Sequence, residues 1–430
     1  MKKTKRSEEE LEGVSVTEID AFIYGKKIGT LLEHQGTIYF EYDEKFKLEK
    51  LEISPIKLPV KNDLYTNKEH KSLYQGMPGV FFDSLPDKHG MAFIDRYFER
   101  QGLKSNEITL LDKLAFIGDR GMGAIEYFPK EHEQNVLKAN VINAKGTYEK
   151  TKKDLEDGNS TITDLMNILD SVSPVGGGRP KMLVQYDKKN KKIKINTKVK
   201  DEDCIRAIIK FDEVYEGMGS IGLTKLEYIM MSLAKEAGIN TANFELIEEN
   251  NQHHLIVERF DRNKNDEKIH MCTVSGLMHI NISIAQATSY ENLFMLTKRI
   301  CKSQIDIEEL FRRMIFNILV FNFDDHAKNF AYLMDKNGKW CLSPAYDITY
   351  SKGLAKQHLT TIAGKSLEIT RDDVLKIAKS FSIKPKIANQ IIDKCIEVVS
   401  IFDKKAKILN LNGDDIKKYN DDLISQIELL

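Results

Sequence analysis

Residues 322–347 read NFDDHAKNFAYLMDKNGKWCLSPAYD, and this stretch decides the fold that we expect for the chain. Its first part gathers acid, imidazole, amine and amide groups in one short loop: Asp324, Asp325, His326, Lys328 and Asn329. Apolar runs on both sides of Asn337-Gly338 then predict a β-hairpin, because an Asn-Gly pair favours a tight turn. Folded about that pair, the hairpin sets residue 329 opposite residue 346 or 347. The carboxylate of Asp347 is therefore expected beside Asn329.

This convergence favours phosphoryl transfer. Two carboxylates and an amide oxygen are hard ligands that suit Mg²⁺. An Asp, an Asn five positions later, a hairpin and a second Asp is the order found in protein kinases, where they serve as base and metal ligands. The pattern predicts Asp324 as the catalytic base and Asn329 and Asp347 as Mg²⁺ ligands, while His326 and Lys328 support the catalysis.

A structural interpretation of the same residues stays open. Asp324 and Asp325 can cap backbone groups, His326 can be a hydrogen-bonded core histidine, and Asp347 can serve a turn. For any of these residues alone, this interpretation is the better one. The combination of spacing, hairpin length and terminal Asp favours the kinase.

The loop is expected to follow a helix. Asp306 followed by Glu309 predicts a capped helix start, and Leu310, Met314, Ile318 and Phe321 form its predicted buried stripe. Further upstream, the segment 224–238 is predicted to be a helix that ends at Gly238.

Other parts of a nucleotide site can be assigned upstream. Lys210 lies on the predicted strand CIRAIIKF, residues 204–211, and Glu227 on the next helix is its possible partner. Equally, Lys210 can be a solvated lysine at a strand end. Residues 171–181 read SVSPVGGGRPK, and the glycines at 176–178 permit a backbone to approach phosphates closely, although a triple glycine is also typical of a linker.

The segment VERFDRN, residues 257–263, ends a strand between the two predicted halves of the chain. Its backbone can pair with adenine while Asp261 reaches a ribose hydroxyl. The alternative is a ladder of surface charges. Seven lysines between Lys188 and Lys200 are expected to decorate a solvated hairpin rather than a nucleic-acid contact.

Composition sets outer limits on function. The chain has 430 residues, of which 41% are hydrophobic and 30% charged, and this excludes a disordered chain. A formal net charge of -1 predicts no attraction of the whole molecule to nucleic acid. Five scattered cysteines are expected to be reduced, and no apolar run resembles a signal peptide or a membrane span. We therefore expect a cytoplasmic protein without membrane contact.

The pattern of elements predicts four regions. Residues 1–15 are a polar tail, and residues 16–130 form a β-rich subdomain that starts with an antiparallel meander. Residues 131–257 are expected to form the smaller lobe of a kinase, with the glycine-rich loop and the ATP lysine. Residues 258–430 are expected to form a helical lobe that carries the catalytic loop and the metal-binding Asp.

Eight fragments in this order resemble the HipA-like serine/threonine kinases: AFIYGKKIGTLLEHQGTIYFEYD, FFDSLPD, GDRGMGAIEYF, GGGRPK, AIIKF, VERFDR, DDHAKNF and LSPAYDI. The resemblance extends over nearly the whole chain from about residue 16. It implies an α+β fold of the two-lobed protein-kinase type, with an extra β-rich N-terminal subdomain and a mainly helical C-terminal lobe.

The resemblance also implies roles for individual residues. Asp324 would be the catalytic base, Asn329 and Asp347 would bind Mg²⁺, and Lys210 would bind the phosphates of ATP. The remaining positions are Glu258 and Phe260 at adenine, Asp261 at the ribose, Gly176, Gly177 and Gly178 in the phosphate-covering loop, and Ser173 as an autophosphorylation site that switches the kinase off.

Members of this family are typically toxins of type II toxin–antitoxin pairs. The resemblance implies a protein substrate, with aminoacyl-tRNA synthetases as the known targets, and a small DNA-binding antitoxin as partner. DNA would be contacted only through that antitoxin. Two other functions remain open: a small-molecule phosphotransferase, which a deep acidic cleft would favour, and a non-catalytic co-repressor that only binds the antitoxin and DNA.

Overall fold

The structure is a computed structural model and describes residues 16–61, 63–67, 74–86, 88–100, 103–128, 141–142, 181–195, 200–212, 214–215, 219–220, 222–249, 252–353 and 356–430. Four residues of the predicted site, Ser173, Gly176, Gly177 and Gly178, lie outside these ranges, as does the predicted polar tail. Within the described residues, no helix is long and apolar enough to cross a membrane.

The N-terminal part of the chain builds an antiparallel sheet with the strand order β3-β2-β1-β4. Its strands are β1 (Glu18–Ile23), β2 (Lys26–His34), β3 (Thr37–Tyr42) and β4 (Ile125–Phe128). Two-residue turns, Tyr24-Gly25 and Gln35-Gly36, join the first three strands, and all four turn residues have positive φ. This is the turn geometry that fits the twist of a hairpin, so the predicted meander is confirmed.

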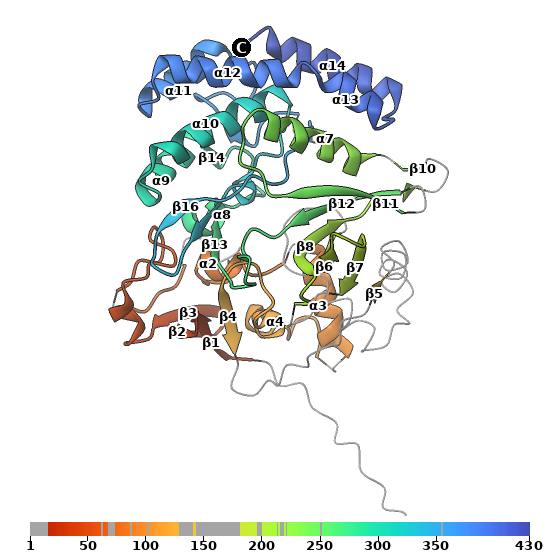
Figure 1. The fold of residues 1–430 in the computed structure, drawn as a ribbon. Coiled ribbons are helices and arrows are strands. Elements are labelled where there is room, and N and C mark those ends of the chain that lie inside the picture. The colour runs from red at the N-terminus through yellow and green to blue at the C-terminus, as the bar shows by residue number, and fades with distance from the viewer. Residues whose placement is uncertain are drawn as a thin grey trace, which may run out of the picture.

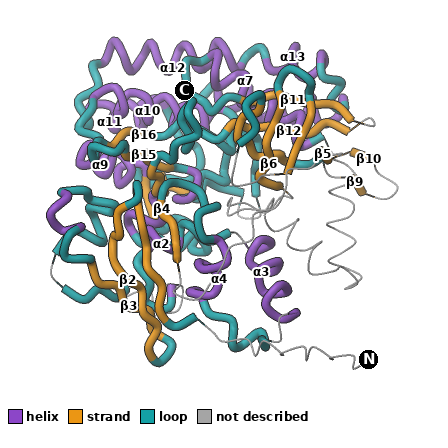
Figure 2. The backbone as a smooth tube through the Cα atoms, turned by 60° about the horizontal axis from the view of Figure 1, so that its bottom comes forward, coloured by secondary structure: helices purple, strands orange, loops and turns teal. Residues whose placement is uncertain are grey.

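Short helices lie between β3 and β4. They are η1 (Phe46–Glu49), α2 (Gly79–Phe82), α3 (Lys88–Arg100) and α4 (Leu110–Ile117). Thr109 caps α4 through a capping box with Asp112, whose carboxylate also accepts a hydrogen bond from the Val16 N–H. Figure 2 shows α4 beside this sheet and α3 next to α4.

The middle of the chain builds a second sheet with the strand order β11-β12-β8-β6-β7-β5. Its strands are β5 (Val141–Ile142), β6 (Lys181–Asp187), β7 (Lys192–Ile195), β8 (Cys204–Lys210), β11 (Phe244–Glu249) and β12 (Gln252–Glu258). A two-stranded ribbon, β9 (Val214–Tyr215) with β10 (Gly219–Ser220), precedes helix α7 (Leu223–Glu236). Helix α7 ends before Gly238, which has a φ of +87°, as predicted.

The C-terminal half is mainly helical. Its helices are α8 (Val274–Met278), α9 (Tyr290–Ile300), α10 (Gln304–Leu319), η3 (Ala327–Asn329), α11 (Arg371–Ser380), α12 (Pro385–Val399), α13 (Phe402–Ile408) and α14 (Gly413–Ile427). Figure 1 shows α11 to α14 as an outer layer over α7 and α10, with the N-terminal sheet at the opposite end of the molecule. Two small sheets complete this half: β13 (His270–Thr273), β15 (Ala331–Met334) and β16 (Trp340–Leu342), and the parallel pair β14 (Thr288–Ser289) and β17 (Thr360–Thr361).

The hairpin of β15 and β16 forms as predicted, but its register differs by one residue. Tyr332 pairs with Leu342, and this register, continued along the strands, sets Asn329 against Ala345 rather than residue 346 or 347. The loop contains three residues, because Asp335 bonds to Lys339 across it and Gly338 has a φ of +80°. Gly338, in the left-handed conformation, therefore closes a three-residue turn, whereas the sequence predicts a two-residue turn.

The start of α10 also differs from the prediction. Ser303 is the N-cap, and its side chain accepts a hydrogen bond from the Asp306 N–H at 3.3 Å. Glu309 instead binds Arg313 at 2.8 Å and accepts a hydrogen bond from the Asn240 N–H at 3.0 Å. Because α10 begins directly after Ser303, Asp306 and Glu309 both lie inside the helix, and Glu309 pairs with Arg313 one turn later and with the distant Asn240 backbone. The predicted apolar stripe is confirmed except at Phe321, which is only partly buried and lies beyond the helix.

Two apolar cores organise these elements. The larger core runs from the N-terminal sheet through α7 and α10 to the C-terminal helices. The smaller core belongs to the six-stranded sheet and contains Met182, Val184, Tyr186, Ile193, Ala207, Ile209, Phe211 and Ile256. The N-terminal subdomain therefore packs directly against the helical lobe.

A close backbone approach joins these two parts. Helix α2 contacts helix α8. The N–H of Gly79 donates to His279 Nε2 at 2.9 Å. A Cβ added at Gly276 would lie 2.2 Å from Asp83 Oδ2 and 3.0 Å from the Gly79 carbonyl oxygen. Only a residue without a side chain fits between the two helices.

We predict that Gly276→Ala lowers the free energy of unfolding by about 2 kcal/mol, because the added methyl must push two packed helices apart. Chemical denaturation of both proteins checks this. Gly413→Ala is the matched control, since a Cβ there meets nothing within 4 Å. A Gly276→Ala protein as stable as the control variant would contradict the proposed close packing.

Candidate active site

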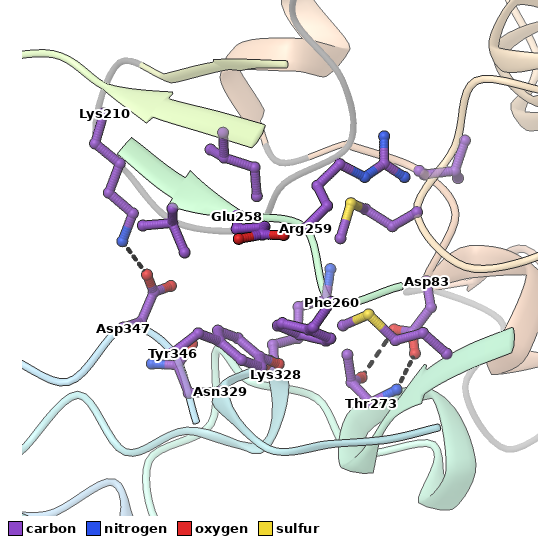
Figure 3. A pocket seen from close by; sticks show the side chains of 15 residues that line it. Asp83, Lys210, Glu258, Arg259, Phe260, Thr273, Lys328, Asn329, Tyr346 and Asp347 are labelled. Carbon is purple, nitrogen blue, oxygen red and sulfur yellow. Dashed lines mark hydrogen bonds and ion pairs between the residues drawn. The ribbon is translucent and has the colours of Figure 1, made fainter. Parts of the chain in front are cut away.

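A pocket opens where the three parts of the chain meet (Figure 3). It encloses about 800 Å³ of space, including open solvent at its mouth. Its lining comes from the N-terminal subdomain, the six-stranded sheet, the linker after β12 and the helical lobe: Asp83, Leu85, Met122, Ile208, Lys210, Val257, Glu258, Arg259, Phe260, Met271, Thr273, Lys328, Asn329, Tyr346 and Asp347. A pocket between subdomains that combines apolar side chains with a few charged groups is the usual place for a small-molecule ligand.

The ammonium group of Lys210 is the centre of the site. Lys210 ends β8, and its Nζ lies 2.5 Å from Glu227 Oε1 on α7 and also contacts Asp347 Oδ1 (Figure 3 shows the Asp347 contact). The side chains of Lys210 and Glu227 are 9% and 3% exposed, and that of Asp347 is 21% exposed. The predicted pairing of Lys210 with Glu227 is thus confirmed, and a second carboxylate joins it.

This arrangement keeps Lys210 and Asp347 charged. Burial alone would lower the pKa of Lys210, but the negative charges of Asp347 and Glu227 outweigh it and raise the pKa. Burial would raise the pKa of Asp347, yet Lys210, Lys181 and His326 hold it at about 2. Asp347 also has a φ of +53°, in the left-handed region that Asp adopts more readily than most non-glycine residues.

The loop after α10 brings Asn329 to the pocket and leaves Asp324 outside the lining residues. The Asn329 Nδ2 donates to the Asp324 carbonyl oxygen at 2.7 Å. The NH₂ group of Asn329 is therefore directed to the loop. Its amide oxygen can then bind a cation. The Asp324 side chain is 54% exposed, and its Oδ1 lies 3.8 Å from His326 Nε2.

Asp325 has the structural role that the alternative interpretation assigned to it. Its buried carboxylate accepts hydrogen bonds from the backbone N–H groups of Leu359 and Thr360, at 2.9 and 3.1 Å, and lies 2.9 Å from His358 Nδ1. Because these bonds connect the loop after α10 to residues 359 and 360, Asp325 fixes the backbone next to Asp324.

Lys328 reaches the pocket, whereas His326 does not line it. The Nζ atom of Lys328 lies 5.5 Å from the centre of the Phe82 ring in the N-terminal subdomain. The carbonyl oxygen of Lys328 accepts a hydrogen bond from the Tyr346 hydroxyl at 2.6 Å. His326 is partly buried close to Asp324.

The linker after β12 forms another wall. The Glu258 side chain is directed to Lys188 at 3.0 Å and Asn243 at 3.1 Å, so its backbone is the part that can meet a ligand. The ring of Phe260 packs against that of Tyr346, with 5.6 Å between their centres and 30° between their planes. A planar ligand can lie against this aromatic pair.

Asp261 is placed differently from the prediction. Its fully buried carboxylate binds Arg259 at 2.7 Å and Arg262 at 2.8 Å, and accepts a hydrogen bond from the Gly123 N–H at 2.7 Å. Burial would raise its pKa, but the two guanidinium groups hold the pKa well below the usual range. The Asp261 carboxylate, which we expect from the sequence to contact a ribose, instead connects the linker to the loop before β4.

Sequence reasoning missed the pocket residues of the N-terminal subdomain. Asp83 and Leu85 lie in the fragment FFDSLPD, and Met122 in GDRGMGAIEYF, both of which carried the family resemblance without a role. Asp83 hydrogen-bonds to Thr273, 190 positions away. No local pattern encodes a contact over that separation.

Comparison with known proteins agrees with this geometry. The family model for the HipA-like C-terminal domain matches residues 173–401, and the model for the HipA N-terminal domain matches residues 19–128. The chain belongs to the HipA family. The HipA N-terminal match coincides with the first sheet and its helices. The HipA-like C-terminal match includes all the pocket-lining residues that lie outside the N-terminal subdomain.

Curated relatives of this HipA-family chain are named as kinases. A putative kinase of Haemophilus influenzae is 25% identical over 173 residues, 37% of this chain and 50% of that protein. The serine/threonine-protein kinase toxin HipA of Shewanella oneidensis is 26% identical over 162 residues, 33% of this chain and 36% of that protein. The chain spans 50% of the length of the first relative and 36% of the length of the second.

A solved structure shows the same fold. The complex of HipA, HipB and operator DNA from Shewanella oneidensis MR-1 contains a chain that matches with a TM-score of 0.68 and 18% sequence identity. The match covers 95% of this chain and 96% of that one. It confirms the α+β, kinase-like HipA fold that the sequence predicts.

We predict that Lys210→Met lowers the free energy of unfolding by about 3 kcal/mol at pH 7, because Glu227 and Asp347 are left buried without their cation. In the wild type, the pKa of Asp347 is depressed to about 2, so its contribution is present above about pH 4 and is lost as the pH falls toward 2. In the variant, Asp347 has lost the cation that lowers its pKa, so it gains a proton more easily when folded. Denaturation between pH 4 and 8 should therefore show a deficit that shrinks as the pH falls.

Lys26→Met is the control for this experiment, because Lys26 forms an exposed ion pair with Glu49. Its stability should change by less than about 0.5 kcal/mol. A Lys210→Met deficit that is small, or that does not vary with pH, would show that the buried ion triad has been misassigned.

Proposed function

We propose that this protein is a serine/threonine protein kinase that uses ATP and Mg²⁺. The observation that carries the proposal is the meeting of Lys210, Asn329 and Asp347 in one pocket that is bordered by the linker after β12. A strand lysine paired with a helix glutamate, an asparagine in the catalytic loop and an acid after the hairpin are the parts that kinases use for phosphoryl transfer.

The pocket offers a surface for each part of ATP. The backbone of residues 258–260 and the Phe260–Tyr346 pair can take adenine. Lys210 lies at the other side of the pocket. Its ammonium group can bind the phosphates while it still contacts Asp347. We propose no ribose contact for Asp261, because its carboxylate is already bound by two arginines.

The residues present fit Mg²⁺. Asn329 supplies an amide oxygen, and Asp347 stays ionised with a pKa of about 2. Mg²⁺ prefers a small number of such oxygens together with phosphate oxygens and water. When bound, the ion would neutralise charge on the phosphates.

Asp324 can act as the base that accepts the proton of the substrate hydroxyl. Its carboxylate is exposed, while its carbonyl oxygen is bonded to Asn329 at the pocket wall. An exposed base beside a nucleotide pocket suits a hydroxyl on the surface of another protein. His326, 3.8 Å from Asp324, can orient this carboxylate.

The pocket argues against the small-molecule phosphotransferase. That alternative is favoured by a deep acidic cleft, but the charged side chains that the lining residues direct at the pocket are of both signs: Lys210 and Lys328 beside Asp83 and Asp347. The non-catalytic co-repressor is not favoured either, because a repressor has no need of a charged triad inside a pocket.

We further propose that the kinase is the cytoplasmic toxin of a type II toxin–antitoxin pair. The Shewanella oneidensis structure contains HipA with HipB and operator DNA, which supports a small DNA-binding antitoxin as the partner and contact with DNA only through it. A translation protein such as an aminoacyl-tRNA synthetase is the proposed target. Ser173 is the proposed autophosphorylation site, with Gly176, Gly177 and Gly178 in the loop that covers the phosphates.

Radiolabelled ATP tests the kinase directly. Purified protein with Mg²⁺ and host lysate should transfer the γ-phosphate to serine or threonine of a lysate protein. Asp324→Asn should reduce the rate by at least about a hundredfold, because a positioned base contributes that much to proton transfer. Asp347→Asn should do the same by weakening the metal site.

Asp393→Asn is the matched control, because Asp393 is an exposed acid on α12 that pairs with Arg371. Its activity should equal that of the wild type. Label transferred equally by Asp324→Asn and wild type would reject the assigned base. Label found on an added small alcohol or aminoglycoside, but on no protein, would support the alternative phosphotransferase.

A further inference from the structure

Asn322, two residues before the proposed base Asp324, is a buried amide that the function proposed above does not use. The backbone around it leaves α10 in a defined direction. The Asn322 N–H donates to the Asn317 carbonyl oxygen at 3.0 Å, and the Phe321 N–H donates to the Ile318 carbonyl oxygen at 3.3 Å. With Phe321 at a φ of +51°, these bonds form a Schellman motif, which fixes how the chain continues after a helix.

The side chain of Asn322 is anchored to two packed helices. Its Nδ2 donates to Asn317 Oδ1 on α10 at 3.1 Å. The Nδ2 of Asn317 in turn donates to the hydroxyl of Tyr290, the first residue of α9, at 3.0 Å. All three residues are buried, and α9 and α10 contact each other in the larger core. The orientation of the Asn322 amide is therefore set by the rigid part of the helical lobe.

The same amide reaches the segment that carries Asp347. The Asn322 Nδ2 lies 3.5 Å from the Asp347 carbonyl oxygen, at the long end of the hydrogen-bond range. Two backbone bonds hold the segments side by side: the Phe323 N–H donates to the Ser351 carbonyl oxygen at 2.9 Å, and the Ser351 N–H donates to the Phe321 carbonyl oxygen at 3.0 Å. Because Asn322 lies between these two bonds, its contact with Asp347 is held from both sides.

We propose that Asn322 is a positioning residue of the phosphoryl-transfer site, which sets the metal-binding Asp347 relative to the base Asp324. This inference rests on the proposed kinase function. Asp324 follows Asn322 by two residues on the same loop, and Asp347 bears the carbonyl group that the Asn322 amide contacts. A single buried side chain thus connects the two acids that act on opposite ends of the transfer.

The physical reason for such a residue is the precision that phosphoryl transfer needs. Catalysis of this kind consists of positioning and electrostatic stabilisation, and hydrogen bonds behind the reacting groups keep them in place. A change in the backbone angles of Asp347, whose φ is +53°, would move its carbonyl group and its carboxylate together. A donor at the carbonyl oxygen opposes that change without occupying the metal site.

The test is the kinetics of Asn322→Leu, which fills a similar volume but donates no hydrogen bond. Phosphate transfer from ATP is measured for kcat and for the Mg²⁺ concentration that gives the half-maximal rate. We expect kcat to fall roughly tenfold to a hundredfold and the required Mg²⁺ to rise about threefold or more, because the two acids are no longer held together. Adenosine affinity, measured by calorimetry, should change by less than about twofold, since adenosine has no phosphates and needs no metal.

Thr297→Val is the matched control, because it also removes a buried hydrogen bond of the helical lobe. The Thr297 hydroxyl lies 2.7 Å from the Tyr332 hydroxyl, and neither residue lines the pocket. This variant should keep the kcat and the Mg²⁺ requirement of the wild type. Equal losses of kcat in both variants would overturn the proposal, as would a loss of adenosine affinity as large as the loss of kcat, since Asn322 would then only maintain the fold.

Tyr290→Phe decides the question if Asn322→Leu does not fold. It keeps the buried ring and removes only the hydroxyl that anchors Asn317. We expect kcat to fall roughly twofold to fivefold, in the range of one hydrogen bond between neutral groups, and the required Mg²⁺ to rise in the same direction as in Asn322→Leu. Wild-type kinetics in Tyr290→Phe would overturn the proposed anchoring of Asn322.

The proposed kinase and this inference fail in different ways. Calorimetry of ATP at several Mg²⁺ concentrations measures the metal dependence of binding without any phosphate transfer. If Asn322→Leu shifts this dependence in a protein that transfers no phosphate, the proposed kinase is overturned and the positioning of Asp347 is upheld. If the wild type transfers phosphate and Asn322→Leu does so with unchanged kcat and Mg²⁺ requirement, the kinase is upheld and the inference is overturned.

Discussion

The ammonium group of Lys210, enclosed by two carboxylates, is the interaction on which the site depends. Glu227 lies 17 positions away on α7 and Asp347 lies 137 positions away, after the hairpin of the helical lobe. Removing one member of such a buried set leaves an uncompensated charge, which costs far more than the set contributes as a whole. The triad therefore specifies how the six-stranded sheet, α7 and the helical lobe meet, and it leaves a fixed positive charge at the pocket.

The sequence predicts the parts of the site that short patterns encode. The strand that carries Lys210, the helix that carries Glu227 and the hairpin that returns Asp347 all follow from periodicity and turn residues. Its predictions fail where a distant partner competes with a local one. Glu309 binds the Asn240 backbone, 69 positions away, as well as Arg313 within α10, and forms no capping box. Asp261 binds two arginines and the Gly123 backbone, 138 positions away, instead of a ligand.

The division of the apolar residues into two cores explains which parts of the site are held together. The N-terminal sheet shares the larger core with α7, α10 and the C-terminal helices, whereas strands β6, β7 and β8 have their own small core. Asp83, Lys328 and Thr273 therefore belong to one packed body. The Lys210 wall is attached to that body through the ion triad, through β12 and through the linker.

The linker itself is fixed by buried charge. Arg259 and Arg262 bind Asp261, and they also donate to the carbonyl oxygens of Gly121 and Gly123 in the loop before β4. Three buried charges in one cluster add little net stability, but they require a single arrangement of the two segments. Because Met122 lies between these two glycines and lines the pocket, the cluster aligns the linker wall with the N-terminal wall. The side of the pocket that can take adenine is thus set by the N-terminal subdomain, while the side that can take phosphates is set by Lys210.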